Sequence, residues 1–122
     1  MRPITAHIVE GVNEPLALNV LDEPSPSGAN HHYLITYSPG DGRPAVSRPI
    51  RFQYGPIAEG VNGITHEALL AIVQDRLACL QCGPFACETN RQALEHVSLA
   101  LESLQALTRE RMERGADDPH RS

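Results

Sequence analysis

The sequence predicts an α+β protein: a small antiparallel β meander followed by a long antiparallel α-helical hairpin that mediates oligomerisation. Alternating apolar residues, interrupted by prolines and glycines, fill the first half of the chain. After Gly63 apolar residues recur every three or four positions instead, and the pair Gly83-Pro84 divides that half in two. At 122 residues, the chain has the length of one compact domain, or of one module with a small appendage.

Four short strands are expected in the N-terminal half. They span residues 4–9, 16–21, 32–37 and about 48–54. The second places Leu16, Leu18 and Val20 on one face. The fourth contains Pro49, which has no N–H for a sheet, so we expect this strand to begin at the proline or to lie on an edge.

Two helices of unequal length are expected next. The first begins at Thr65, a good N-terminal cap, and runs to about Gln81, while the second runs from near Cys87 to Arg114. At 1.5 Å per residue they span roughly 25 Å and roughly 40 Å. The second helix carries two apolar stripes, more than its partner helix can cover, so we expect helices to pack between subunits.

These elements define the expected domain organisation. A β-rich N-terminal part covers residues 1–57, a helical hairpin domain covers 58–115, and a disordered tail covers 116–122.

The charge of the chain excludes several classes of protein. Fifteen acidic residues against ten basic ones give a net charge of −5, which disfavours binding to a nucleic-acid polymer. All ten basic residues are arginine, so Schiff-base chemistry and a phosphate-loop lysine are excluded. Neither a membrane span nor a signal peptide is recognisable, so we expect a cytoplasmic protein with no membrane partner.

No metal, cofactor or catalytic site is predicted. Cys79, Cys82 and Cys87 are too few for a structural zinc, and the first two fall at a helix C-terminus, where the dipole does not activate a thiol. His31 and His32 open a strand, so their side chains point to opposite faces. No nucleophile has a base at a recognisable spacing, and we therefore expect a protein that is not an enzyme.

The turn between the helices groups the residue types that a small nucleotide needs. Phe85 offers a flat ring, Asn90 an amide and Arg91 a guanidinium, beside the free N–H groups of a helix N-terminus. Farther along the helix, Arg111 has no acid partner at helical spacing. The competing interpretation is a capped turn followed by a solvated helix.

Residues 52–115 closely resemble the hairpin domain shared by phage Thoeris anti-defence and anti-CBASS proteins. The resemblance rests on FQ-x-GP, GVNGIT-x-EALLAIV-x-DRL, GPFAC-x-x-N-x-x-AL and T-x-x-R-x-x-RG. The preceding strands resemble the β-rich N-terminal portion of the Thoeris anti-defence branch.

The resemblance implies a sponge for signalling nucleotides. Such proteins bind and sequester, without cleaving, cyclic ADP-ribose isomers or cyclic di- and trinucleotides of bacterial immunity. They act in the infected host as oligomers, commonly hexamers, with pockets between subunits. The implied ligand-binding positions are Leu80, Phe85, Asn90, Arg91, Thr108 and Arg111. An alternative is an oligomeric helical protein–protein adaptor of phage origin, whose helix stripes recruit a host protein.

This chain departs from the family pattern at three of its positions. Leu80 stands where an aromatic residue is usual, and Glu88 and Leu107 stand where arginines are usual. Arg91 follows Glu88 by nearly one helical turn and can restore the charge from a neighbouring direction. The departures predict an altered choice of ligand.

Overall fold

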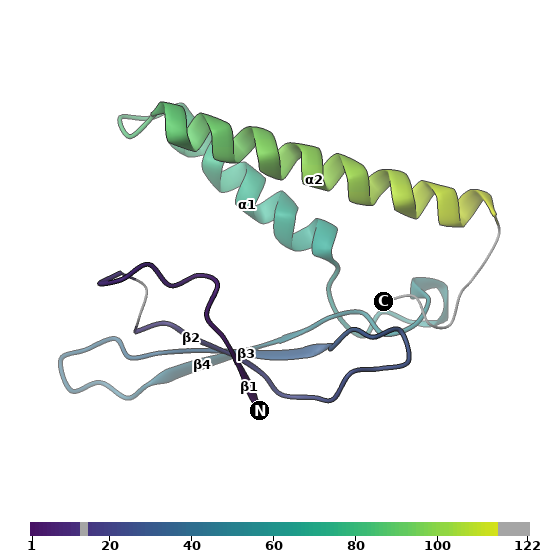
Figure 1. Cartoon of the computed structure of the whole chain (residues 1–122), viewed down its shortest axis with the longest axis horizontal. Helices are drawn as coiled ribbons and strands as arrows, with labels where there is room; N and C mark the ends of the chain where they lie inside the picture. Colours follow the sequence, from purple (N-terminus) through teal and green to yellow (C-terminus); the bar gives the residue numbers. More distant parts are fainter. Residues whose placement is uncertain (13–14, 115–122) are drawn as a thin grey trace. The chain divides into compact units, whose positions relative to one another are not determined.

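The computed structural model describes residues 1–12 and 15–114. The described chain forms two compact units, and the boundary between them in the sequence falls after Gly63. The first unit is a four-stranded antiparallel sheet with strand order β1-β2-β3-β4 (Figure 1). The second is a pair of long helices. The elements are β1 (Arg2–Ile4), β2 (Ala17–Val20), β3 (His32–Tyr37), β4 (Val46–Arg51), a 3-10 turn (Ile57–Glu59), α1 (His66–Gln81) and α2 (Glu88–Glu113). The predicted α+β class, a meander followed by a helical hairpin, is confirmed.

One face of the sheet gathers its apolar side chains. The register pairs Leu18 with Ile35 and Val20 with Tyr33, and Tyr33 with Ile50 in turn, so these residues share a face. Val20 is 2% exposed and is the centre of this small core. The ring of Tyr33 meets that of Phe52 edge to face, with centroids 5.5 Å apart.

Three of the four predicted strands are confirmed within a few residues. β3 has the predicted bounds, β2 is one residue shorter at each end, and β4 begins and ends slightly earlier than expected. β4 is an edge strand that carries Pro49 opposite Leu34, as its proline requires.

The first predicted strand is wrong in its position. The strand is Arg2–Ile4, so only the first residue of the predicted span 4–9 belongs to it. The chain turns instead, and Val9 and Val12 form an isolated antiparallel bridge around Gly11, whose φ of 81° suits glycine. The alternation that predicted a strand over residues 4–9 therefore belongs to a turn.

The segment from residue 53 to residue 62 is closed into a loop by two amide side chains. Gln53, 4% exposed, donates from Nε2 to the carbonyls of Gly55 (3.2 Å) and Gly60 (2.9 Å), and its Oε1 accepts from the N–H of Asn62 (3.0 Å). Asn62 in turn accepts from the N–H of Tyr54 through Oδ1 and donates to its carbonyl through Nδ2, both at 2.8 Å. These bonds satisfy loop backbone groups that a strand ladder would otherwise pair. The motif residues Gln53, Gly55 and Asn62 thus have a structural role.

Gly63 ends this loop at a point of close backbone approach. A Cβ at Gly63 would collide with the backbone carbonyl of Phe52 and lie 2.6 Å from the carbonyl oxygen of Arg51. Only a residue without a side chain fits here.

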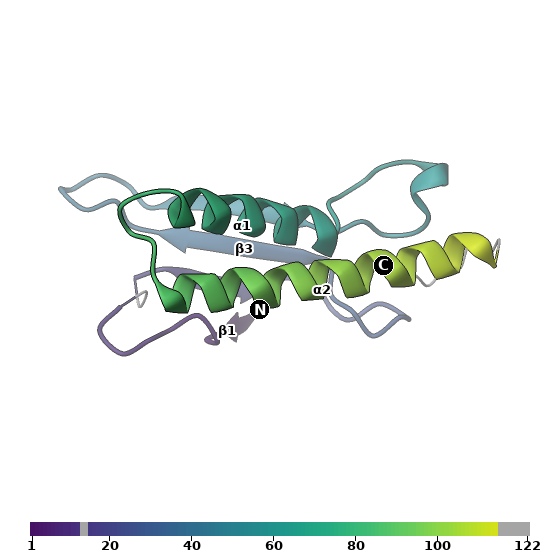
Figure 2. The same cartoon turned by 90° about the horizontal axis from the view of Figure 1, so that it is seen from above.

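The two helices lie side by side as an antiparallel hairpin, which both views show (Figures 1 and 2). α1 has 16 residues and α2 has 26, so α2 extends past the start of α1 by roughly 15 Å. Thr65 caps α1, since its Oγ1 accepts from the N–H of Ala68 at 3.1 Å. The predicted helix bounds are confirmed within one or two residues, while the predicted tail over 116–122 lies outside the described residues.

Polar contacts join the hairpin at two levels. Gln74 donates from Nε2 to Oγ of Ser98 at 3.0 Å, and Thr108 donates from Oγ1 to Oε2 of Glu67 at 2.8 Å. Between them Leu101, 8% exposed, is the buried apolar residue of the described hairpin. Several large apolar side chains remain exposed on the helices, namely Ile72, Val73, Leu99, Leu107 and Met112. Neither α1 nor α2 combines the length and hydropathy needed to cross a membrane.

Candidate functional site

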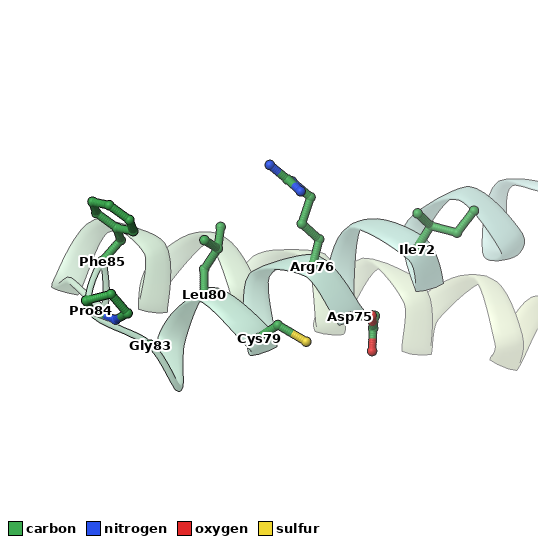
Figure 3. A pocket seen from close by; sticks show the side chains of 8 residues that line it. All are labelled: Ile72, Asp75, Arg76, Cys79, Leu80, Gly83, Pro84 and Phe85. Atoms are coloured by element: carbon green, nitrogen blue, oxygen red, sulfur yellow. The ribbon is translucent and has the colours of Figure 1, made fainter.

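A groove of about 510 Å³ runs along the C-terminal half of α1 and onto the turn that leads into α2. Its volume lies within the range of about 300–1,000 Å³ that is usual for small-molecule sites. The lining residues are Ile72, Asp75, Arg76, Cys79, Leu80, Gly83, Pro84 and Phe85 (Figure 3). Leu80 and Phe85, two of the positions implied by the family resemblance, therefore lie in one groove.

Helical spacing aligns the side chains of this groove. Ile72, Arg76 and Leu80 follow one another at four-residue intervals and share one side of α1, where Figure 3 shows the ring of Phe85 as well. Phe85 is 75% exposed, so its ring face is open to a ligand. A guanidinium and an aromatic ring thus flank an aliphatic surface.

Asn90 supports the turn that presents Phe85. Its Nδ2 lies 3.4 Å from the carbonyl oxygen of Phe85, and its N–H lies 3.4 Å from Sγ of Cys87, the N-terminal cap of α2. Gln81 closes the turn from the other side, since its Oε1 accepts from the N–H of Cys87 at 3.0 Å. Asn90 and Phe85, which the sequence groups at this turn, are therefore in contact.

Arg91 is held by acidic neighbours of its own helix. Its Nε lies 2.9 and 3.0 Å from the two carboxylate oxygens of Glu88, its Nη2 lies 2.6 Å from Oε1 of Glu88, and its Nη1 lies 3.0 Å from Glu95. These hydrogen bonds raise the pKa of Arg91 and lower the pKa of Glu88. The cluster carries two negative charges and one positive charge, so a phosphate must compete with carboxylates for this guanidinium.

Thr108 and Arg111 lie toward the other end of α2. Arg111 follows Asn90 by 21 positions, which corresponds to roughly 30 Å along the helix axis. Thr108 uses its hydroxyl in the contact with Glu67, whereas Arg111 is half-buried and makes no ion pair with a described residue. Within one protomer, therefore, Thr108 and Arg111 are not brought to the groove.

Arg76 is a groove residue that lies in the family motif DRL but was not among the predicted ligand-binding positions. It makes no ion pair with any residue in the described part of the chain, so its guanidinium is available to an anion. An arginine on an amphipathic helix is indistinguishable in sequence from one on a solvated face. The available signal was its position four residues before Leu80.

The three cysteines are free, exposed thiols around the turn. All three are accessible to solvent, so none of them packs into the interior of the hairpin. Over residues 1–12 and 15–114, no three His, Cys, Asp or Glu side chains converge on a point that could hold a metal ion.

Comparison with known proteins identifies the family. Residues 46–106, half of the chain, match the family described as "Acb2/Tad1, hairpin domain". The chain is also 39% identical over 72 residues to a protein of Bacillus phage SBSphiJ7 named "Thoeris anti-defense 1". That alignment covers 58% of this chain and 51% of the phage protein, so the chain matches about half the length of this curated relative. The chain belongs to the Acb2/Tad1 hairpin domain family.

Proposed function

We propose that this protein is an anti-defence sponge that binds and sequesters, without cleaving them, cyclic signalling nucleotides of bacterial antiphage immunity. The candidate ligands are cyclic ADP-ribose isomers and cyclic di- and trinucleotides, bound in the cytoplasm of the infected host. The observation that carries the proposal is the hairpin groove, in which the guanidinium of Arg76 lies on the same side as the open ring of Phe85 and has no ion-pair partner over residues 1–12 and 15–114. The name of the relative, Thoeris anti-defense 1, supports an anti-defence role.

The groove supplies the two contacts that a cyclic nucleotide requires. A base can stack on the ring of Phe85, and the phosphates can accept hydrogen bonds from Arg76. Leu80 adds an aliphatic surface to the groove at the position where an aromatic residue is usual in the family. The groove therefore favours a ligand that stacks on one aromatic ring.

A second copy of the chain completes the proposed site. Thr108 and Arg111 lie roughly 30 Å along α2 from Asn90, too far apart to contact one small ligand. An antiparallel partner hairpin places its own Arg111 beside the groove, and the exposed Leu99 and Leu107 provide apolar surface for such packing. We propose a homo-oligomer, with the hexamer as the expected assembly.

The chemistry of the groove favours retention over cleavage. Cys79 is its nucleophilic side chain, and no histidine lines the groove to take the thiol proton. The charged side chains that line the groove are those of Asp75 and Arg76. The proposed role is therefore binding alone.

Isothermal titration calorimetry with cyclic ADP-ribose isomers and cyclic di- and trinucleotides tests the proposal. At least one ligand is expected to bind, and Arg76→Gln is expected to weaken it by about tenfold or more, the effect of one charge-assisted contact. Arg48→Gln, which removes an arginine of β4 outside the groove, is the matched control. Absence of binding to every ligand at tens of micromolar would contradict the proposal.

Mass spectrometry of the heat-released ligand separates a sponge from a hydrolase. The ligand is expected to be recovered chemically unchanged after prolonged incubation with the protein. A recovered ligand that has gained water would show that the protein hydrolyses it.

A further inference from the structure

Asn62 is the one asparagine of the sequence that is followed by glycine. In a flexible chain this dipeptide is chemically unstable, because a glycine without a side chain lets its own nitrogen reach the amide carbon of the asparagine. The nitrogen of Gly63 attacks Cγ of Asn62, and the amide nitrogen leaves with the displaced proton as ammonia. The cyclic succinimide that forms is then opened by water to aspartate or isoaspartate. The net reaction consumes water and releases ammonia.

The reacting amide of Asn62 is paired with the backbone of Tyr54 at both of its polar atoms. Oδ1 accepts from the N–H of Tyr54 and Nδ2 donates to the carbonyl of the same residue, both at 2.8 Å. Ring closure would turn the planar Cγ into a tetrahedral centre and expel Nδ2. The reaction must therefore break this paired arrangement, which opposes it in the folded protein.

The attacking nitrogen belongs to a backbone that is held as firmly. The N–H of Asn62 donates to Oε1 of Gln53 at 3.0 Å, and Gln53 is 4% exposed. At Gly63 the chain passes so close to the main chain of Phe52 and Arg51 that a Cβ would lie 2.6 Å from the carbonyl oxygen of Arg51. The closed loop thus restrains the backbone around both reacting groups.

We propose that Asn62-Gly63 is a latent deamidation site, protected while the loop over residues 53–62 is closed and reactive whenever that loop opens. The rate of modification then follows the population of the open loop, as hydrogen exchange and proteolysis do for other local openings. The site belongs to the strand unit and does not depend on the nucleotide-binding function proposed for the hairpin.

The products of the reaction do not fit the closed loop. Aspartate has no Nδ2 donor and sets a carboxylate oxygen against the carbonyl of Tyr54, where the amide makes its 2.8 Å bond. Isoaspartate lengthens the main chain by a methylene group next to Gly63, where even an added Cβ would collide with backbone. Opening followed by deamidation is therefore a one-way loss of the closed loop.

Mass spectrometry of the peptide that contains Asn62 and Gly63 tests the protection. The intact protein is incubated in buffer, and in the same buffer with enough urea to unfold it, at one pH and temperature. Conversion of the amide to the acid is expected to be about tenfold or more slower in the folded protein. Equal rates in the two samples would overturn the proposal, and this comparison needs no variant to fold.

Gln53→Ala tests whether the hydrogen bonds of the loop provide the protection. It removes the bonds from Gln53 to Gly55, Gly60 and Asn62, so deamidation in buffer is expected to accelerate several-fold while the rate in urea stays the same. Gln74→Ala is the matched control, because it removes a glutamine hydrogen bond from the hairpin. A folded Gln53→Ala protein with the wild-type rate would contradict the proposed protection.

The modified chains test the one-way step. After incubation in urea, deamidated and unmodified chains are separated by anion-exchange chromatography and returned to buffer. The deamidated chains are expected to melt about 4 °C or more below the unmodified ones, the effect of losing a hydrogen bond in a domain of this size. Asn62→Asp is expected to reproduce the part of this loss that is due to the missing donor. Identical melting temperatures for modified and unmodified chains would show that the loop closes over the product.

Discussion

Gly63 shows how strongly one residue can be constrained by the backbone around it. The position that a Cβ would occupy is already filled by backbone atoms of Phe52 and Arg51. Because backbone cannot move aside as a flexible side chain can, any substitution here must displace the loop or the end of β4.

Gly63→Ala is therefore expected to lower the free energy of unfolding by about 2 kcal/mol or more. The measurement is urea unfolding followed by circular dichroism. Gly83→Ala is the matched control, because its added Cβ would lie 3.8 Å from the nearest neighbouring atoms, an ordinary contact. Equal free energies of unfolding for the two variants would show that the loop can shift to accommodate the added methyl group without loss of stability.

Asp22 makes the stability of the strand unit depend on pH. Its pKa in the folded protein lies below the ordinary value of 3.8, although partial burial opposes the shift, because backbone amides of His31 and His32 donate to the carboxylate. A carboxyl group with a depressed folded pKa stabilises the fold above its unfolded pKa, and this contribution is lost as pH falls through the folded pKa.

The free energy of unfolding is thus expected to decrease as the pH is lowered from about 5 to about 2. Asp22→Asn removes the titrating group and is expected to make this decline shallower. Urea unfolding of both proteins across that range measures the difference. Parallel curves for the two proteins would show that other carboxyl groups cause the decline.

At the scale of elements, the two helices begin with caps of different quality. Thr65 accepts the N–H of Ala68 through an oxygen at 3.1 Å, whereas Cys87 accepts the N–H of Asn90 through a sulfur at 3.4 Å. A hydroxyl oxygen is a stronger acceptor than a thiol sulfur. α2 therefore starts with a weaker cap than α1.

Cys87→Ser is expected to stabilise the protein by a few tenths to about 1 kcal/mol, and Thr65→Ala to destabilise it by about 1 kcal/mol. Thermal unfolding followed by helical circular dichroism measures both, and Thr65→Ser is the conservative control. A lower melting temperature for Cys87→Ser would show that the thiol makes a packing contact that a hydroxyl cannot replace.

Elements with local signals were predictable, and elements defined by distant partners were not. The helix bounds follow from Thr65, Cys87 and the Gly83-Pro84 pair, all of which are visible in the sequence. β1 was misplaced because its three residues have no alternation of their own and become a strand only through pairing with β2. In the groove, the exposed ring of Phe85 was anticipated, but Arg76 was not, because its role depends on the turn folding beside it.

At the scale of the whole molecule, the described chain buries little apolar surface. Val20 and Leu101 are its buried apolar residues, while Ile72 and Leu99 are 65% and 52% exposed. Marginal burial of this kind is usual in chains whose folded state is completed by association.

The protein is accordingly expected to sediment as an oligomer whose melting temperature rises with concentration. Leu99→Glu is expected to shift the sedimentation coefficient toward that of a smaller species, because it places a charge in the proposed interface. Gln105→Glu adds the same charge at another exposed position of α2 and serves as the control. A monomeric wild-type protein at about 100 μM would contradict this expectation.

Both outer strands of the sheet carry a proline, Pro3 in β1 and Pro49 in β4. The N–H of Leu21 donates to the carbonyl of His32, and the N–H of Phe52 donates to the carbonyl of His31. Because inward and outward N–H groups alternate along an antiparallel strand, the register places the nitrogens of both prolines on the outer side of their strands. Each rim of the sheet therefore lacks a donor where an incoming strand would dock. The two prolines therefore disfavour the addition of further strands at either edge of the sheet, and with it β-aggregation of the strand unit.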